Sequence, residues 1–110
     1  MPAEYYVADS ADGDHIDDPS EDALFLLFGD LNATDNRFVR IRPVADAATW
    51  RVSVTLRGPG RYEVVRRDAA RGEHATDVVA DIGHLAQDLT RWLAARDAPG
   101  LRPERVDGVS

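Results

Sequence analysis

The chain contains no cysteine and no lysine, and each absence narrows what the protein can be. Without cysteine, disulfides and thiolate metal sites are excluded. Because a small secreted domain usually depends on such cross-links, we expect a cytoplasmic protein. All 13 basic residues are arginine, a bias that is typical of a GC-rich genome.

Long hydrophobic runs are also missing. The longest, Ala23 to Phe28, is far shorter than the roughly 20 apolar residues of a membrane-spanning helix. The start of the chain, Met1 to Tyr5, lacks the basic and apolar regions of a signal peptide. We therefore expect no membrane partner. The 110 residues predict one domain over residues 1–98, followed by a loosely ordered tail over 99–110.

The residue patterns of common catalytic and metal sites are absent. No serine lies in a G-x-S-x-G elbow, and the histidines form no H-x-x-x-H pair. His84 and Asp88 are one helical turn apart, which favours a surface hydrogen-bonded pair over a metal site. The acidic run 9–18 fails the calcium-loop pattern because Ile16 stands where an oxygen ligand is required. We expect no catalytic residue, no metal and no cofactor.

The first half of the chain predicts a hairpin and a helix. Tyr5 to Val7 favours a short strand, and Asp12-Gly13 indicates the turn of a hairpin. Asp18-Pro19-Ser20-Glu21 predicts a helix start with Asp18 as the cap. The helix should cover about 19–31. Its buried stripe consists of Leu24, Leu27, Phe28 and Leu31, which leaves Phe25 and Leu26 outside it.

The second half predicts an antiparallel meander and a second helix. Strands are expected at 38–42, 50–56, 61–67 and 73–79. Asp81 caps a helix over about 81–96, whose buried stripe includes Leu85, Leu89 and Leu93. The fold class is therefore α+β: a four- to five-stranded antiparallel sheet in ββ-α-ββββ-α order, with two helices on one face. The other face should be polar and exposed.

Charge is distributed unevenly along the chain. Residues 1–36 carry ten acids and no base, whereas residues 37–71 carry nine arginines and three acids. By alternation, most strand arginines should point away from the Trp50 side of the sheet. They form either a solvated face that pairs with Glu63 and the acidic first third of the chain, or a docking face for an acidic partner: Arg40, Arg42, Arg51, Arg57, Arg61 and Arg67. Because this face lacks aromatic residues for base stacking and the net charge is −7, we do not expect nucleic acid to bind.

Several segments also carry a family resemblance, which covers roughly residues 15–96. They are Asp18 to Leu24, Asp30-Leu31-Asn32, Asp35 to Val39, Trp50 to Val54, Gly60 to Val64 and Asp88 to Leu93. In these segments the chain resembles small uncharacterised actinobacterial proteins and is similar to the immunity proteins of bacterial polymorphic toxin systems. The resemblance implies a small, acidic, non-enzymatic α+β inhibitor. None of these motifs is catalytic, and no functional residue carries over from the family.

We therefore expect a non-enzymatic protein-binding domain. The most specific form of this hypothesis is an immunity-type inhibitor of a bacterial toxin. Acidic residues would steer it toward a basic partner, and two apolar residues would anchor it. The alternatives are a small structural or chaperone-like homodimer, an arginine-rich sheet face that binds an acidic partner, and an enzyme with a deep histidine–carboxylate pocket. The candidate partner-binding residues are Asp9, Asp12, Asp14, Asp17 and Asp18, Phe25 and Leu26, and Arg40, Arg42, Arg51 and Arg57.

Overall fold

A computed structural model describes residues 5–44 and 49–97. In chain order, its elements are β1 (Tyr6–Ser10), β2 (His15–Asp17), α1 (Glu21–Gly29), β3 (Phe38–Pro43), β4 (Trp50–Gly58), β5 (Arg61–Asp68), the short 3-10 turn η1 (Ala69–Arg71), β6 (Glu73–Val79) and α2 (Ile82–Asp97). The tail predicted at 99–110 lies outside the described residues.

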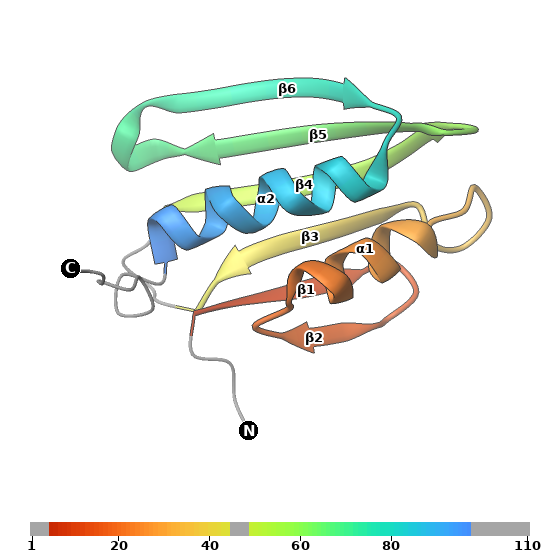
Figure 1. Cartoon of the computed structure of the whole chain (residues 1–110), viewed down its shortest axis with the longest axis horizontal. Helices are drawn as coiled ribbons and strands as arrows, with labels where there is room; N and C mark the ends of the chain where they lie inside the picture. The colour runs from red at the N-terminus through yellow and green to blue at the C-terminus, as the bar shows by residue number, and fades with distance from the viewer. Residues whose placement is uncertain (1–4, 45–48, 98–110) are drawn as a thin grey trace.

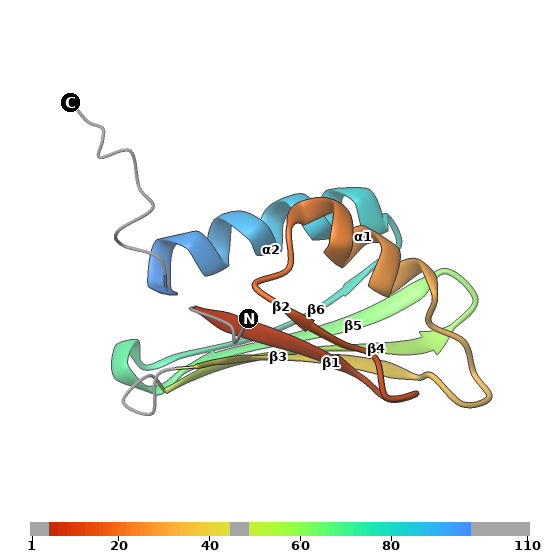
Figure 2. The same ribbon diagram turned by 90° about the horizontal axis from the view of Figure 1, so that it is seen from below.

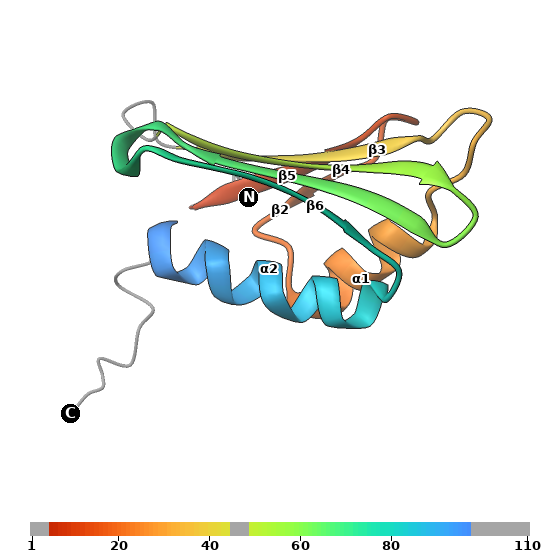
Figure 3. The ribbon, with the colours of Figure 1, turned by 90° about the horizontal axis from the view of Figure 1, so that it is seen from above.

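The strands form one antiparallel sheet in the spatial order β2-β1-β3-β4-β5-β6. Both helices lie against the same face of this sheet (Figure 1). Side views show the resulting two layers (Figures 2 and 3). The predicted α+β class and element order are confirmed. The sheet has six strands rather than four or five, because the N-terminal hairpin joins it through the pairing of β1 with β3.

The inward side chains of β3 and β4 form the centre of the core. Val39 lies opposite Val54, and Ile41 lies opposite Val52. All four side chains are at most 1% exposed. Because successive residues of a strand point to opposite faces, this register also decides which side chains point away from the helices. The residues between these four, among them Arg40, therefore lie on the outer face.

The helix α2 completes the core with one apolar stripe. Leu85, Leu89 and Leu93 recur every four residues and are almost fully buried, as predicted. Trp92 contacts Trp50 of β4 edge to face, with the ring centroids 5.7 Å apart. The carboxylate of Asp81 accepts a hydrogen bond from the backbone N–H of His84, which confirms the predicted cap.

The start of α1 differs from the prediction, because Ser20 and not Asp18 caps the helix. The Ser20 hydroxyl accepts a hydrogen bond from the backbone N–H of Ala23 at 3.1 Å. Asp18 has a left-handed backbone conformation, with φ of 47°. Its carboxylate accepts the N–H groups of Tyr5 and Tyr6, at the beginning of β1. The acid therefore joins the helix entry to the sheet instead of capping the helix.

None of the helices in the described part of the chain is long and apolar enough to cross a membrane.

Two neighbouring leucines of α1 provide a matched test of this packing. Leu27 is 4% exposed and Leu26 is 65% exposed. We expect Leu27→Ala to lower the free energy of unfolding by about 2–5 kcal/mol, because it leaves a cavity in the core. Leu26→Ala should change it by no more than about 0.5 kcal/mol. Urea unfolding followed by circular dichroism measures both, and equal losses would contradict the observed orientation of α1.

Candidate functional site

The outer face of the sheet, on which no helix of residues 5–44 and 49–97 lies (Figure 2), carries four clustered arginines. Arg40 and Arg42 come from β3, Arg51 from β4 and Arg67 from β5. All four are exposed. Together they line an open hollow of about 640 Å³, whose lining also includes Ser53. We call these four residues the arginine cluster.

Strand register explains why the cluster forms. Arg51 lies directly opposite Arg67 in the pairing of β4 with β5. Arg42 follows Ile41, whose partner on β4 is Val52, so Arg42 lies beside Arg51. Neighbouring strands are about 4.8 Å apart. Arg42, Arg51 and Arg67 therefore form a row of positive charge across three adjacent strands.

Few contacts compensate the charge of this row. Within residues 5–44 and 49–97, the side chains of Arg51 and Arg67 have neither an ion-pair nor a hydrogen-bond partner. Arg42 has one ion pair, a 3.4 Å contact between its Nε and Oδ2 of Asp9. Like charges that lie directly opposite one another destabilise a sheet. The row is consequently suited to an anion that approaches from solvent.

A titratable group borders the hollow on the side of β1 and β2. When protonated, His15 donates from Nδ1 to Oδ1 of Asp9 at 2.5 Å and from Nε2 to Oδ1 of Asp17 at 2.8 Å. The contact with Asp9, followed by the contact with Asp17, raises the pKa of His15 above its ordinary value of 6.5. The second oxygen of Asp9 faces Arg42. Asp9 and Asp17, which were expected to bind a partner, therefore already contact residues of this sheet.

The aromatic content of the outer face is low. The guanidinium of Arg40 lies over the ring of Phe38, 4.4 Å from the centroid. Such a cation–π contact contributes about 0.5–1 kcal/mol at an exposed site. Because the cation covers this ring, Phe38 offers no open platform for a stacking base.

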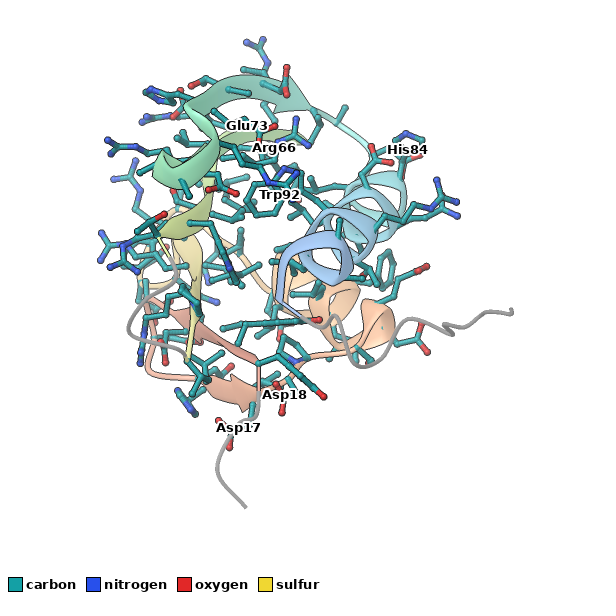
Figure 4. The ribbon with its side chains drawn as sticks, turned by 90° about the vertical axis from the view of Figure 1, so that its left-hand side faces the viewer. Asp17, Asp18, Arg66, Glu73, His84 and Trp92 are labelled. Carbon is teal, nitrogen blue, oxygen red and sulfur yellow. The ribbon has the colours of Figure 1, made fainter. Side chains whose placement is uncertain are left out.

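Arg57 and Arg66 do not belong to the arginine cluster. Arg57 lies near the turn that joins β4 to β5, and its Nε donates a hydrogen bond to Oε1 of Glu63 at 2.9 Å. Arg66 pairs with Asp77 of β6. Figure 4 places Arg66 on the helix side of the sheet, whereas other nitrogen-tipped side chains project from the opposite side. The prediction that Arg57 shares a site with Arg40, Arg42 and Arg51 is therefore not supported by this geometry.

The remaining candidates lie in two further regions. Asp12 and Asp14 are in the turn between β1 and β2, where the Ser10 hydroxyl donates to Asp12 and lowers the pKa of that carboxyl. Phe25 and Leu26 are 44% and 65% exposed on α1, in the opposite layer. The structure thus does not bring the acidic and apolar candidates together into one surface.

Sequence reasoning placed Arg67 on the arginine-rich face but did not include it among the partner-binding candidates. Its place depends on an irregularity in the hairpin of β4 and β5. Gly58 pairs with Arg61, and this register would set Arg51 opposite Asp68. A shift between Leu56 and Gly58 sets it opposite Arg67 instead. The glycines around Pro59 were the available signal for such a shift, but they do not specify its position.

The groups that line the hollow determine what it can do. Arginine remains protonated at physiological pH, so the cluster can donate charge-assisted hydrogen bonds but cannot act as a general base. Among the described residues, no three histidines or acids are placed to hold a metal ion. His84 and Asp88 form a surface pair on α2, 3.2 Å apart, as their spacing predicts. The arrangement therefore has the charge and the hydrogen-bond donors that an anion-binding site requires.

The contact between His15 and Asp9 predicts a pH dependence. We expect His15 to titrate above pH 6.5, and Asp9→Asn to lower its pKa. Because the folded-state pKa is raised, protonated His15 stabilises the fold fully below its unfolded pKa of about 6.5. That stabilisation disappears as the pH rises through the folded pKa. NMR of the ring protons measures the pKa, with Asp22→Asn on α1 as the control; equal values in all three proteins would refute the contact.

Comparisons with known proteins do not identify the site. No protein-family model, curated protein or solved structure matches the chain. The resemblance to immunity proteins therefore stays a prediction. The chemistry of the outer face has to be inferred from its own charges and geometry.

Proposed function

We propose that the chain is a non-enzymatic protein-binding domain that docks an acidic surface of another protein on its arginine cluster. One observation carries this proposal: the row of Arg42, Arg51 and Arg67 across adjacent strands. Two of these three arginines have no ion-pair partner in the described residues. A partner carboxylate would supply the missing charge.

The opposition of Arg51 and Arg67 destabilises the sheet unless an anion binds between them. Opposed like charges cost a sheet several tenths of a kcal/mol, up to about 1 kcal/mol. The chain has 20 acids, and β5 ends in one of them, Asp68. Acids to neutralise Arg51 and Arg67 are therefore present in the sequence, yet none of the described acids forms an ion pair with either arginine. Such a local conflict is typical of a functional surface.

Long-range charge favours a protein partner over nucleic acid. The net charge of −7 repels phosphate backbones at a distance. Salt screens this field beyond about 8 Å, so the arginine cluster acts only at short range. A folded partner with a limited acidic patch can meet these conditions, because it carries less negative charge than a nucleic acid strand.

An immunity-type toxin inhibitor is the narrower form of this proposal, and it rests on the resemblance. The sequence predicts that acidic residues of such an inhibitor, Asp9 and Asp17 among them, steer it toward a basic toxin. The contacts of Asp9 and Asp17 with His15 weaken that version, because these acids are already paired. The version that the geometry favours uses the arginine cluster and requires an acidic surface on the partner.

Binding of an acidic peptide tests the proposal directly. We expect the double variant Arg51→Gln, Arg67→Gln to bind a fluorescein-labelled deca-glutamate peptide about tenfold more weakly than the wild type. The control, Arg61→Gln, Arg91→Gln, makes the same change in net charge at exposed positions that do not line the hollow. Fluorescence polarisation at several salt concentrations measures both. Equal weakening in the two double variants would reduce the effect to net charge and reject the site.

The loss of Arg67 should weaken binding but stabilise the fold of the unliganded protein. Arg67→Gln removes the repulsion between Arg51 and Arg67, so we expect the free energy of unfolding to rise by about 0.2–1 kcal/mol at low salt. The gain should shrink at 1 M salt, where the screening length is about 3 Å. Arg91→Gln on α2 serves as the control for urea unfolding. A destabilised Arg67→Gln variant would show that this arginine has a stabilising contact.

A further inference from the structure

We propose that the group bound by the arginine cluster is a phosphorylated serine or threonine side chain of the partner. This inference rests on the proposed function and specifies the chemistry of the same site. It follows from three features of the hollow: the number of arginines that line it, the polar residue between them, and the exposure of the surface around them.

The number of arginines exceeds what one carboxylate can use. A carboxylate has two oxygens and one negative charge, which a single bidentate guanidinium satisfies. A phosphate monoester carries a charge of about −1.5 to −2 and three free oxygens near pH 7. Arg51 and Arg67 are directly opposite one another, and Arg42 lies beside Arg51. A dianion between two or three of these forks would cancel their mutual repulsion.

The residue between the arginines suits an anion. Ser53 is the outward residue that follows Arg51 on β4, and it lies opposite Arg40 on one side and Val65 on the other. Its small side chain leaves the hollow open between longer neighbours, and its hydroxyl can donate one hydrogen bond. The backbone amides of β3, β4 and β5 are paired within the sheet, so an anion must be held by side chains.

Asp9 acts against the anion at the rim of the hollow. Its Oδ2 faces Arg42 at 3.4 Å, a longer contact than an ideal charge-assisted hydrogen bond. Its Oδ1 accepts from His15, which holds the carboxylate on the β2 side. The anion would therefore occupy the side of the hollow nearer to Arg51 and Arg67. Removing the Asp9 charge should strengthen binding.

The exposure of the cluster indicates that the phosphate arrives on a macromolecule. A small-molecule site normally buries most of its ligand, typically 70–90% of the ligand surface. Here all four arginines are exposed, and the side chain of Arg42 is 53% accessible. The same face continues to β6, where Val78 is 63% exposed. A polypeptide that carries the phosphate could use this additional surface, whereas a free phosphate could not.

Three peptides that differ at one position distinguish the outcomes. Each is a fluorescein-labelled, acidic twelve-residue probe with phosphoserine, glutamate or serine at its centre. We expect the full chain to bind the phosphoserine probe at least about tenfold more tightly than the glutamate probe at 0.15 M salt. Asp9→Asn should strengthen the binding of the phosphoserine probe, and the control Asp22→Asn on α1 should leave it unchanged.

Lysine variants separate bidentate recognition from charge. The double variant Arg51→Lys, Arg67→Lys keeps the charge but removes the planar guanidinium groups. Its preference for the phosphoserine probe over the glutamate probe should therefore shrink to what the difference in probe charge alone produces. Arg61→Lys, Arg91→Lys is the matched control. If a double variant does not fold, NMR of the wild-type chain with inorganic phosphate provides a second measurement. The amides of Arg51, Ser53 and Arg67 should then shift most.

Each remaining outcome has a definite meaning. If the glutamate probe binds as tightly as the phosphoserine probe, and both depend on Arg51 and Arg67, the phosphate inference is overturned and the proposed function stands. If no probe binds, or if a single-stranded RNA oligonucleotide binds more tightly than all of them, both are overturned.

Discussion

The structure depends on the one-sided packing of two helices against the sheet. Val39, Ile41, Val52 and Val54 share one core with the apolar stripe of α2, and the described part of the chain places no second layer on the other side of the sheet (Figure 2). A strand that alternates must then place every second residue in water. The apolar core and the arginine cluster are therefore two products of the same register. A one-residue slip in β4 would bury Arg51 and expose Val52, so the burial of the valines also holds the arginines outward.

Most of the fold could be predicted because its signals are local. The alternation from Trp50 to Leu56, the turn at 58–60 and the leucine stripe of α2 each specify an element within a short window. The strand over 73–79 was predicted with the observed bounds. The cap of α1 could not be assigned in this way, because the role of Asp18 depends on the amides of Tyr5 and Tyr6, thirteen and twelve residues away at the beginning of β1. The number of strands in the sheet likewise depended on a long-range pairing.

The candidate site was less predictable, because it depends on which residues become neighbours across strands. Alternation correctly placed Arg40, Arg42 and Arg51 on the outer face. It could not show that Arg57 would pair with Glu63, since that contact follows from the hairpin geometry. Without the register shift near Gly58, Arg51 would lie opposite Asp68; with the shift, two arginines lie opposite one another. The charge conflict on which the proposed function rests is thus a tertiary feature, which composition does not reveal.

The order of charges across the outer face has a further consequence. Along one direction, the face runs from Asp17 and Asp9, which share the single positive charge of protonated His15, at the β2 side to Arg42, Arg51 and Arg67. This arrangement gives the sheet a lateral dipole in addition to its net charge. A charged body that approaches within a screening length experiences a torque as well as an attraction. The domain can therefore select the angle of approach before any side chain makes contact, so its partner would be rotated into register during the encounter.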